Sequence, residues 1–290
     1  MTESSLLHSV AVGSILDLDP DLGTGILKAD WELARHACTC ELLRSSGDAW
    51  DLRQHADCDL FGLLIVQGLV CREVALSDRR MLEFLGPGDV LHPAVADASP
   101  RLGGSPTLSA VAGTVVAVLG RSFIRAAARW PSLLVAVQRR FEAQREHLAI
   151  QGLIAHLPRA QDRVLLVLWH LASRYGRVTP NGTMLPLRLG HDVIGQLAAA
   201  RRSTTTLAVT ALQADGYLLR LDDGLWLLTT AAQHKVTAIA TATAPTATAL
   251  FAETFALRQR SPEVRDASGA IPRVTPSPSD APERHLVSIG

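Results

Sequence analysis

The sequence has few cysteines, few aromatic residues and no excess of charge of either sign. Four cysteines in 290 residues are too few for a disulfide framework and favour the reducing cytoplasm. Basic and acidic residues number 28 each, which excludes a polycation coating nucleic acid but allows a local basic surface. No apolar run reaches the roughly 18 residues of a membrane span, and the first residues lack a signal-peptide pattern. We expect a cytoplasmic protein with no membrane partner.

The motifs of common enzyme classes are also missing. The sequence has no phosphate-binding P-loop, no Gly-x-Ser-x-Gly turn and no His-Glu-x-x-His zinc motif. His191 and Asp192 are adjacent, but the pair is more typical of the exposed first turn of a helix than of acid–base catalysis. We predict that the protein is not an enzyme and that it needs no cofactor.

Residues 58–120 have the pattern of a small antiparallel β-roll. Short apolar runs such as residues 61–66 alternate with polar turns. Gly86-Pro87-Gly88-Asp89 is a strong turn signal, because proline fixes φ and glycine accepts a positive φ. Residues 1–57 are mixed, with a helix expected around 31–45 and no clear first hairpin, so an abbreviated roll is expected.

Residues 121–157 switch to a helical pattern, with Pro131 suited to the first turn of a long helix. Apolar residues at three-, four- and seven-residue intervals form one stripe along it. The stripe consists of Leu134, Val137, Phe141 and Leu148. Such a stripe either covers a core or forms a dimer seam, and we expect these four residues to form the seam of a homodimer.

Residues 158–230 have the pattern of a winged helix-turn-helix. After an apolar helix over 161–175, a short helix leads through Ala198-Ala199-Ala200 to a second helix, which begins at Arg201 and is expected to bury Leu207. Two strands around Asp222-Asp223-Gly224 then form the wing. This order of elements is typical of a DNA-binding module.

The start of the second of these helices carries the groups that DNA binding requires. Two guanidinium groups can pair with guanine or phosphate, and a run of hydroxyl groups follows. These candidate DNA-binding residues are Arg201, Arg202, Ser203, Thr204, Thr205 and Thr206. Between residues 157 and 228, eight arginines and five aspartates leave an excess of three positive charges. An arginine pair alone is usually a solvated surface, but within this module it predicts binding to double-stranded DNA.

The chain resembles a bacterial Crp/Fnr-type transcriptional regulator over roughly residues 55–228. The resemblance rests on residues 61–68 and the Gly86-Pro87-Gly88-Asp89 turn in the roll. It also rests on residues 187–228 in the winged helix-turn-helix, which we call the reader. It implies an α+β fold: an N-terminal antiparallel, cyclic-nucleotide-binding-like (cupin-like) β-roll, a long dimerisation helix and a C-terminal winged helix-turn-helix. It also implies a homodimeric, sequence-specific DNA-binding regulator with its recognition helix in the major groove.

The recognition helix departs from the family pattern. Arg202 and Thr204 keep the family residues, whereas Ser203 replaces an acidic residue that contacts bases and Leu207 replaces an arginine. Ala199 stands where the family usually has a turn glycine. The resemblance therefore predicts the fold but does not predict the operator sequence.

The roll departs further. His92-Pro93 stands where the family has a Gly-Glu pair that binds the nucleotide, and residues 104–107 of the phosphate-binding stretch include no arginine, although Arg101 lies nearby. A neutral site holds a desolvated phosphate poorly. We expect no ordinary cAMP pocket, and a roll that supports the dimer or responds to an unidentified small-molecule effector.

The cysteines and the C-terminal segment leave two further expectations. Some relatives hold an iron–sulfur cluster or haem, so the alternative function is a metal, haem or redox sensor that acts through protein contacts. Its candidate ligands are Cys38, Cys40, Cys58 and Cys71, with His36 nearby. Their spacing matches no common cluster motif, so we predict inert thiols and no metal.

Residues 231–290, rich in alanine, threonine and proline, are expected to be a disordered tail with a short helix around 250–257.

Overall fold

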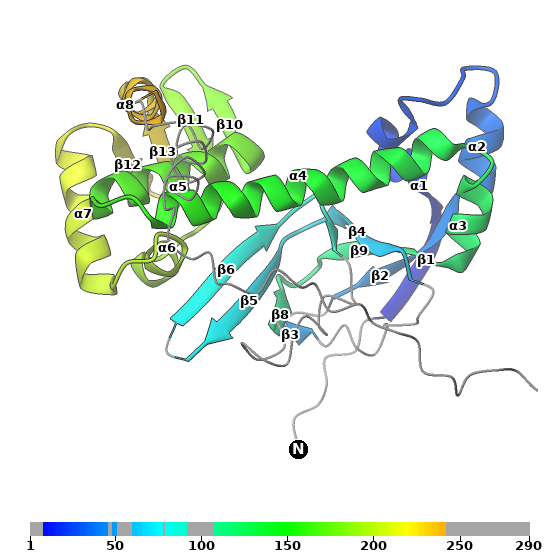
Figure 1. Cartoon of the computed structure of the whole chain (residues 1–290), viewed down its shortest axis with the longest axis horizontal. Helices are drawn as coiled ribbons and strands as arrows, with labels where there is room; N and C mark the ends of the chain where they lie inside the picture. The colour runs from blue at the N-terminus through cyan, green and yellow to red at the C-terminus, as the bar shows by residue number, and fades with distance from the viewer. Residues whose placement is uncertain (1–7, 46–47, 51–59, 78, 92–106, 242–290) are drawn as a thin grey trace, which may run out of the picture. The chain divides into compact units, whose positions relative to one another are not determined.

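Two antiparallel sheets form the roll in the N-terminal half of the chain (Figure 1). The computed structural model describes residues 8–45, 48–50, 60–77, 79–91 and 107–241. Within them, one sheet has the order β1-β2-β9-β4-β7 and the other β3-β8-β5-β6. The strands are β1 (His8–Ser14), β2 (Thr39–Arg44), β3 (Asp48–Trp50), β4 (Gly62–Gln67), β5 (Val70–Leu76), β6 (Arg79–Leu85), β7 (Val90–Leu91), β8 (Thr107–Ala110) and β9 (Val115–Leu119). The predicted antiparallel roll is confirmed.

The apolar run at residues 61–66 is continuous because β4 is buried on both faces. Leu63 and Ile65 pack in the cluster between the sheets, whereas Leu64, on the opposite face, packs beneath the covering helices. Alternate side chains of a strand point to opposite faces, so a strand covered on both sides needs apolar residues at every position.

The roll begins much earlier than predicted. β1 pairs with β2 and β2 with β9, so the first strand pair lies within residues 1–57 and the expectation of an abbreviated roll was wrong. The helix expected around residues 31–45 is shorter, because α2 (Trp31–Ala37) gives way to β2. Further helical segments between and after these strands are α1 (Ile15–Leu18), the 3-10 helix η1 (Pro20–Gly23) and α3 (Arg121–Ala127).

The long helix is α4 (Pro131–Ala155), with proline in its first turn as predicted. The residues predicted to form the dimer seam pack instead against other parts of the same chain. Val137 has no exposed surface and belongs to the cluster beneath the helices, so its assignment to a dimer seam was wrong. Leu134 and Phe141 pack against the same cluster, and Leu148 lines a small cavity beside the reader.

The reader comprises α5, α6, α7 and α8 with a four-stranded sheet in the order β10-β11-β13-β12. Its elements are α5 (Ala160–Tyr175), β10 (Arg177–Thr179), β11 (Gly182–Leu185), α6 (His191–Leu197), α7 (Arg202–Ala214), β12 (Leu218–Arg220), β13 (Trp226–Thr229) and α8 (Thr230–Ala240). The predicted winged helix-turn-helix is therefore present.

Residues 231–240, which were assigned to the predicted tail, form most of helix α8, and residues 242–290 lie outside the described residues. The Thr229 hydroxyl caps α8 by accepting the Ala232 backbone N–H, and Ala232 and Val236 are buried in the reader core. These contacts make residues 231–240 part of the reader. The helix expected around 250–257 lies outside the described residues. In the described part, no helix is long and apolar enough to cross a membrane.

Candidate nucleic-acid interface

The first two turns of α7 present most, but not all, of the predicted DNA-binding residues. Arg201, Arg202, Ser203, Thr204 and Thr206 are exposed. Thr205 has no exposed surface, and its hydroxyl donates to the Arg201 carbonyl at 3.0 Å. Thr205 is therefore a packing residue, and its assignment to DNA binding was wrong.

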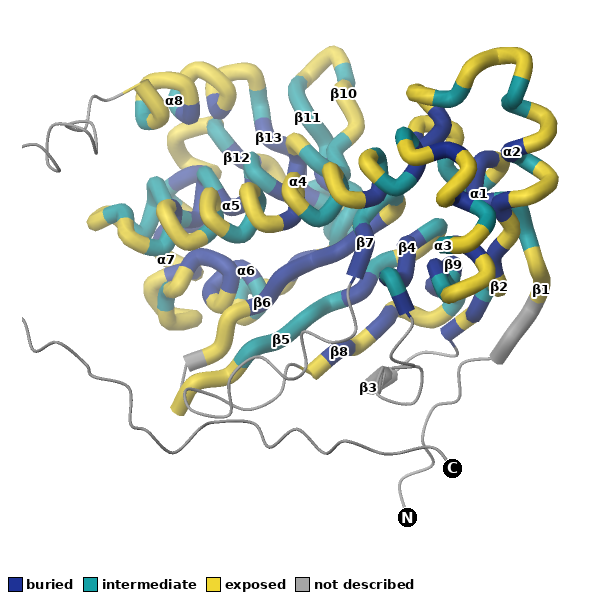
Figure 2. Tube along the Cα trace, turned by 45° about the vertical axis from the view of Figure 1, so that its right-hand side comes forward, coloured by how far each residue is buried: buried dark blue, intermediate teal, exposed yellow. Residues whose placement is uncertain are grey.

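Leu207 also lies differently from the prediction. It was expected to be buried, yet it is 72% exposed on α7. The buried side of the helix is formed by Thr205, Ala208, Val209 and Leu212. A helix turns by about 100° per residue, which places Leu207 on the outward side with Ser203. Figure 2 shows α7 at an edge of the reader, with exposed residues along its length.

A close contact between α6 and α7 fixes how α7 is presented. A Cβ atom on Gly195 would lie 2.8 Å from the Ala200 carbonyl oxygen and 2.9 Å from Thr205 Oγ1, so only glycine fits there. Between the helices Ala199 has φ +49°, a left-handed conformation that favours glycine. Gly195 was missed because a glycine inside a helix has no periodicity to mark it.

The charges at the start of α7 are paired only at the surface. Arg202 Nη1 lies 3.0 Å from Asp192 Oδ2, with side chains 73% and 58% exposed. His191 Nδ1 lies 3.0 Å from Thr206 Oγ1. Exposed ion pairs contribute little to stability, so a phosphate can replace Asp192 as the partner of Arg202 at low cost.

The wing is tied to the reader core by Trp226. Its ring is fully buried, and its indole N–H donates to the Leu189 carbonyl at 3.0 Å. The guanidinium of Arg220, an exposed residue of β12, lies 4.8 Å from the centre of this ring. The wing therefore presents a cation held over a rigid aromatic surface.

A second cluster joins the reader to the roll. Arg174 of α5 lies 2.6 Å from Asp89 Oδ2, with side chains only 10% and 18% exposed, and donates to the Phe84 carbonyl at 3.1 Å. The Tyr175 hydroxyl lies 2.9 Å from the same carbonyl and 3.1 Å from Asp89 Oδ2. Asp89 also accepts the Gly86 N–H at 2.7 Å. The predicted turn thus anchors α5.

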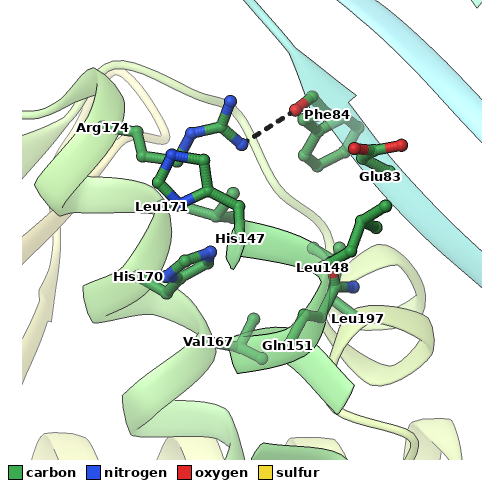
Figure 3. A pocket seen from close by; sticks show the side chains of 10 residues that line it. All are labelled: Glu83, Phe84, His147, Leu148, Gln151, Val167, His170, Leu171, Arg174 and Leu197. Atoms are coloured by element: carbon green, nitrogen blue, oxygen red, sulfur yellow. Dashed lines mark hydrogen bonds between the residues drawn. The ribbon is translucent and has the colours of Figure 1, made fainter. Parts of the chain in front are cut away.

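Beside this cluster, His147 of α4 and His170 of α5 face each other with ring centres 5.3 Å apart (Figure 3). They line a cavity of about 10 Å³, room for roughly one water molecule. Burial, together with the neighbouring His147 and Arg174, lowers the pKa of His170 to about 4. Burial likewise lowers the pKa of His147. Both rings are therefore neutral near pH 7.

β6 is held against α4 by buried polar groups. Glu83 forms an ion pair with Arg72 and accepts the Gln144 amide at 3.0 Å, while the Gln151 amide donates to the Leu82 carbonyl at 2.7 Å. Sequence analysis missed this role of the long helix, because a buried glutamine looks like an interruption of the apolar stripe.

The predicted effector residues and one cysteine cannot be placed. His92, Pro93, Arg101 and residues 104–106 lie outside the described residues, as does Cys58. Cys38 and Cys40 are buried in the cluster beneath the helices, whereas the side chain of His36 is 69% exposed. Burial raises the pKa of Cys40 to about 12, and burial raises that of Cys71 to about 11.

These thiols resist forming the thiolate that metal binding and redox chemistry require. In the described part of the chain, no three histidine, cysteine or carboxylate side chains come close enough to hold a metal ion.

Comparison with known proteins identifies the fold. No family model and no curated protein matches the sequence. A solved cyclic nucleotide-binding domain containing protein from Listeria monocytogenes EGD-e matches with a TM-score of 0.54 and 14% identity, over 72% of this chain and 96% of that one. A CooA mutant from Carboxydothermus hydrogenoformans matches with a TM-score of 0.51 and 18% identity, over 64% and 81% of the two chains.

A transcriptional regulator of the CRP family from Thermus thermophilus is 18% identical with a TM-score of 0.47, over 62% of this chain and 89% of that one. The Listeria protein and CooA, whose TM-scores exceed 0.5, show that the predicted α+β fold is present.

Proposed function

We propose that the chain is a homodimeric, sequence-specific DNA-binding transcriptional regulator that inserts α7 into the major groove. The observation that carries this proposal is the start of α7, where Arg201, Arg202, Ser203 and Thr204 are exposed together. The close α6–α7 contact at Gly195 sets the orientation of this surface, and the wing adds Arg220. Presentation of arginines and hydroxyls at the start of a helix suits base and phosphate contacts.

A homodimer would use the side of α4 that faces away from the roll. Val135, Ile150 and Leu153 are 50%, 37% and 70% exposed, and their spacing places them on one side of the helix. We propose that these residues, and not the predicted stripe through Val137, form the seam. Two copies related by a two-fold axis would then present two reader helices to a near-palindromic site.

The dimer is tested by sedimentation equilibrium of the full chain. Leu153→Glu should shift the protein to monomer, because it places a charge in an apolar seam. Leu219→Glu, at an exposed leucine of the wing, should leave the dimer intact. A monomeric wild-type protein would contradict the seam.

The roll would support the dimer or respond to an unidentified small molecule. The sequence supports the absence of an ordinary cAMP pocket, since His92-Pro93 replaces the Gly-Glu pair that the family uses. Binding to DNA without added effector would favour the supporting role.

DNA binding is tested by fluorescence anisotropy on the chain's own upstream DNA and on a scrambled duplex, over a salt series. We expect tighter, salt-dependent binding to the upstream fragment. Arg202→Ala should weaken it by about 5- to 150-fold if Arg202 contacts a base, whereas Arg125→Ala, which removes an exposed charge from α3 of the roll, should not. Equal binding to both duplexes, or an unchanged affinity of Arg202→Ala, would contradict the proposal.

A further inference from the structure

The exposed side of the reader helix is less polar than its sequence suggests. The Thr206 hydroxyl donates to the Arg202 carbonyl at 3.0 Å, and the Thr210 hydroxyl donates to the Thr206 carbonyl at 3.0 Å. Both protons are thus used within the helix. These threonines therefore offer a ligand mainly their methyl groups, because Thr206 Oγ1 also lies 3.0 Å from His191 Nδ1.

Leu207 lies among these groups. It is 72% exposed, four residues after Ser203 and three before Thr210, so the three side chains share one side of α7. The buried residues on the opposite side and the close contact at Gly195 prevent α7 from rotating about its axis to bury Leu207. A single exposed leucine is normal on a protein surface, but this one stands on the surface that would enter the groove.

The major groove offers such a side chain one apolar partner. The 5-methyl group of thymine is the apolar feature of the base edges there, whereas the other bases present hydrogen-bonding groups. Leucine against those groups would remove them from water without replacing their hydrogen bonds. From this we infer that Leu207 packs on a thymine methyl group, so that each half-site of the DNA target contains an A·T pair at the position facing Leu207. The inference rests on the proposed function and specifies its target.

The experiment selects binding sites from a random duplex library with the full-length protein and then removes single methyl groups. Each thymine of the selected half-site is replaced in turn by deoxyuridine, which pairs identically and lacks the 5-methyl group. Wild-type protein should bind about fourfold more weakly at one thymine per half-site, the value expected for one buried methyl group. Leu207→Ala should bind the thymine and deoxyuridine duplexes equally. Leu219→Ala, at the exposed leucine of the wing, should retain the wild-type difference.

The outcomes separate this inference from the proposed function. If no sequence is enriched, sequence-specific binding fails and the inference fails with it. If a site is enriched but every deoxyuridine substitution leaves wild-type affinity unchanged, the inference alone is overturned. It is also overturned if Leu207→Ala, shown by circular dichroism to be folded, keeps the fourfold difference.

Discussion

Two arginines of the reader pair with aspartates in the same chemistry and in opposite surroundings. Arg174 and Asp89, which join α5 to the roll, are 10% and 18% exposed, whereas Arg202 and Asp192 at the start of α7 are 73% and 58% exposed. The first pair is supported by the Phe84 carbonyl and the Tyr175 hydroxyl. The second pair is surrounded mainly by solvent.

The difference in burial gives the two pairs different roles, one in positioning a helix and one in binding a ligand. We call Arg174–Asp89 the inner pair and Arg202–Asp192 the outer pair. A buried charge that loses its partner keeps a large desolvation cost, so the inner pair fixes the position of α5 against the roll. An exposed pair gives up little when it opens, so the outer arginine is available to a phosphate or a base. The two regions should therefore respond differently to the same kind of substitution.

The largest effect is expected at the inner pair. Arg174→Met removes the partner of Asp89 and the bond to the Phe84 carbonyl, and should lower the free energy of unfolding by about 3 kcal/mol. Urea unfolding of the full chain measures this loss. Arg202→Met is the matched control and should stay within about 0.5 kcal/mol of wild type. Similar losses in both variants would break the comparison.

A smaller effect is expected where the reader helices touch. Gly195→Ala would place a Cβ atom 2.8 Å from the Ala200 carbonyl oxygen, so the free energy of unfolding should fall by about 2 kcal/mol and DNA affinity should fall with it. Gly152→Ala, where a Cβ atom meets nothing within 4 Å on α4, should instead gain about 0.5–1 kcal/mol. Thermal unfolding of both variants tests this; a neutral Gly195→Ala would show that α7 can shift.

Sequence reasoning found the elements more readily than their partners. The roll turn at residues 86–89, the helix starting at Pro131 and the wing around Gly224 each have a local signal, because proline and glycine restrict or permit particular backbone angles. The order of helix, turn, helix and hairpin was enough to identify the reader. The first strand pair was missed because β1 is followed by residues without strand alternation, and its pairing with β2 depends on a contact distant in sequence.

Burial is a tertiary property, and that explains the errors at the candidate site. Val137 and Leu153 both fit an apolar helical position, but only the folded roll decides which one is covered. Thr205 and Thr206 are neighbours with the same side chain, yet a helical turn of about 100° buries one and exposes the other. A sequence can place an apolar stripe on a helix without showing whether its own chain or a second copy covers it.

A pH effect of about 2 kcal/mol is expected beside the inner pair. The pKa of His170 in the folded protein is about 4, below the ordinary value of 6.5, so the unfolded chain takes up a proton first as the pH falls. Stability from this group is therefore complete above pH 6.5 and declines between pH 6.5 and about 4. Unfolding at pH 7 and pH 5 should show a decline that is about 2 kcal/mol smaller in His170→Gln.

Other titratable groups beside the same cavity also contribute to the pH dependence, and they are identical in the wild-type protein and in His170→Gln. His147 contributes with the same sign, because burial lowers its pKa, whereas burial raises the pKa of Glu83 and so opposes it. Comparing the variant with wild type cancels these contributions. Identical profiles for His170→Gln and wild type would show that His170 titrates normally.

The smallest effect on stability, and a gain in binding, is expected at the outer pair. Asp192→Asn removes the carboxylate 3.0 Å from Arg202 and should change the free energy of unfolding by less than about 0.5 kcal/mol. In the proposed complex the same carboxylate would repel the phosphates that Arg202 approaches. DNA affinity at low salt should therefore rise by a few fold and the gain should shrink as salt increases, because salt screens exposed charges. Reduced affinity at every salt concentration would mean that Asp192 holds Arg202 in the geometry that DNA requires, and the outer pair would then share the positioning role of the inner one.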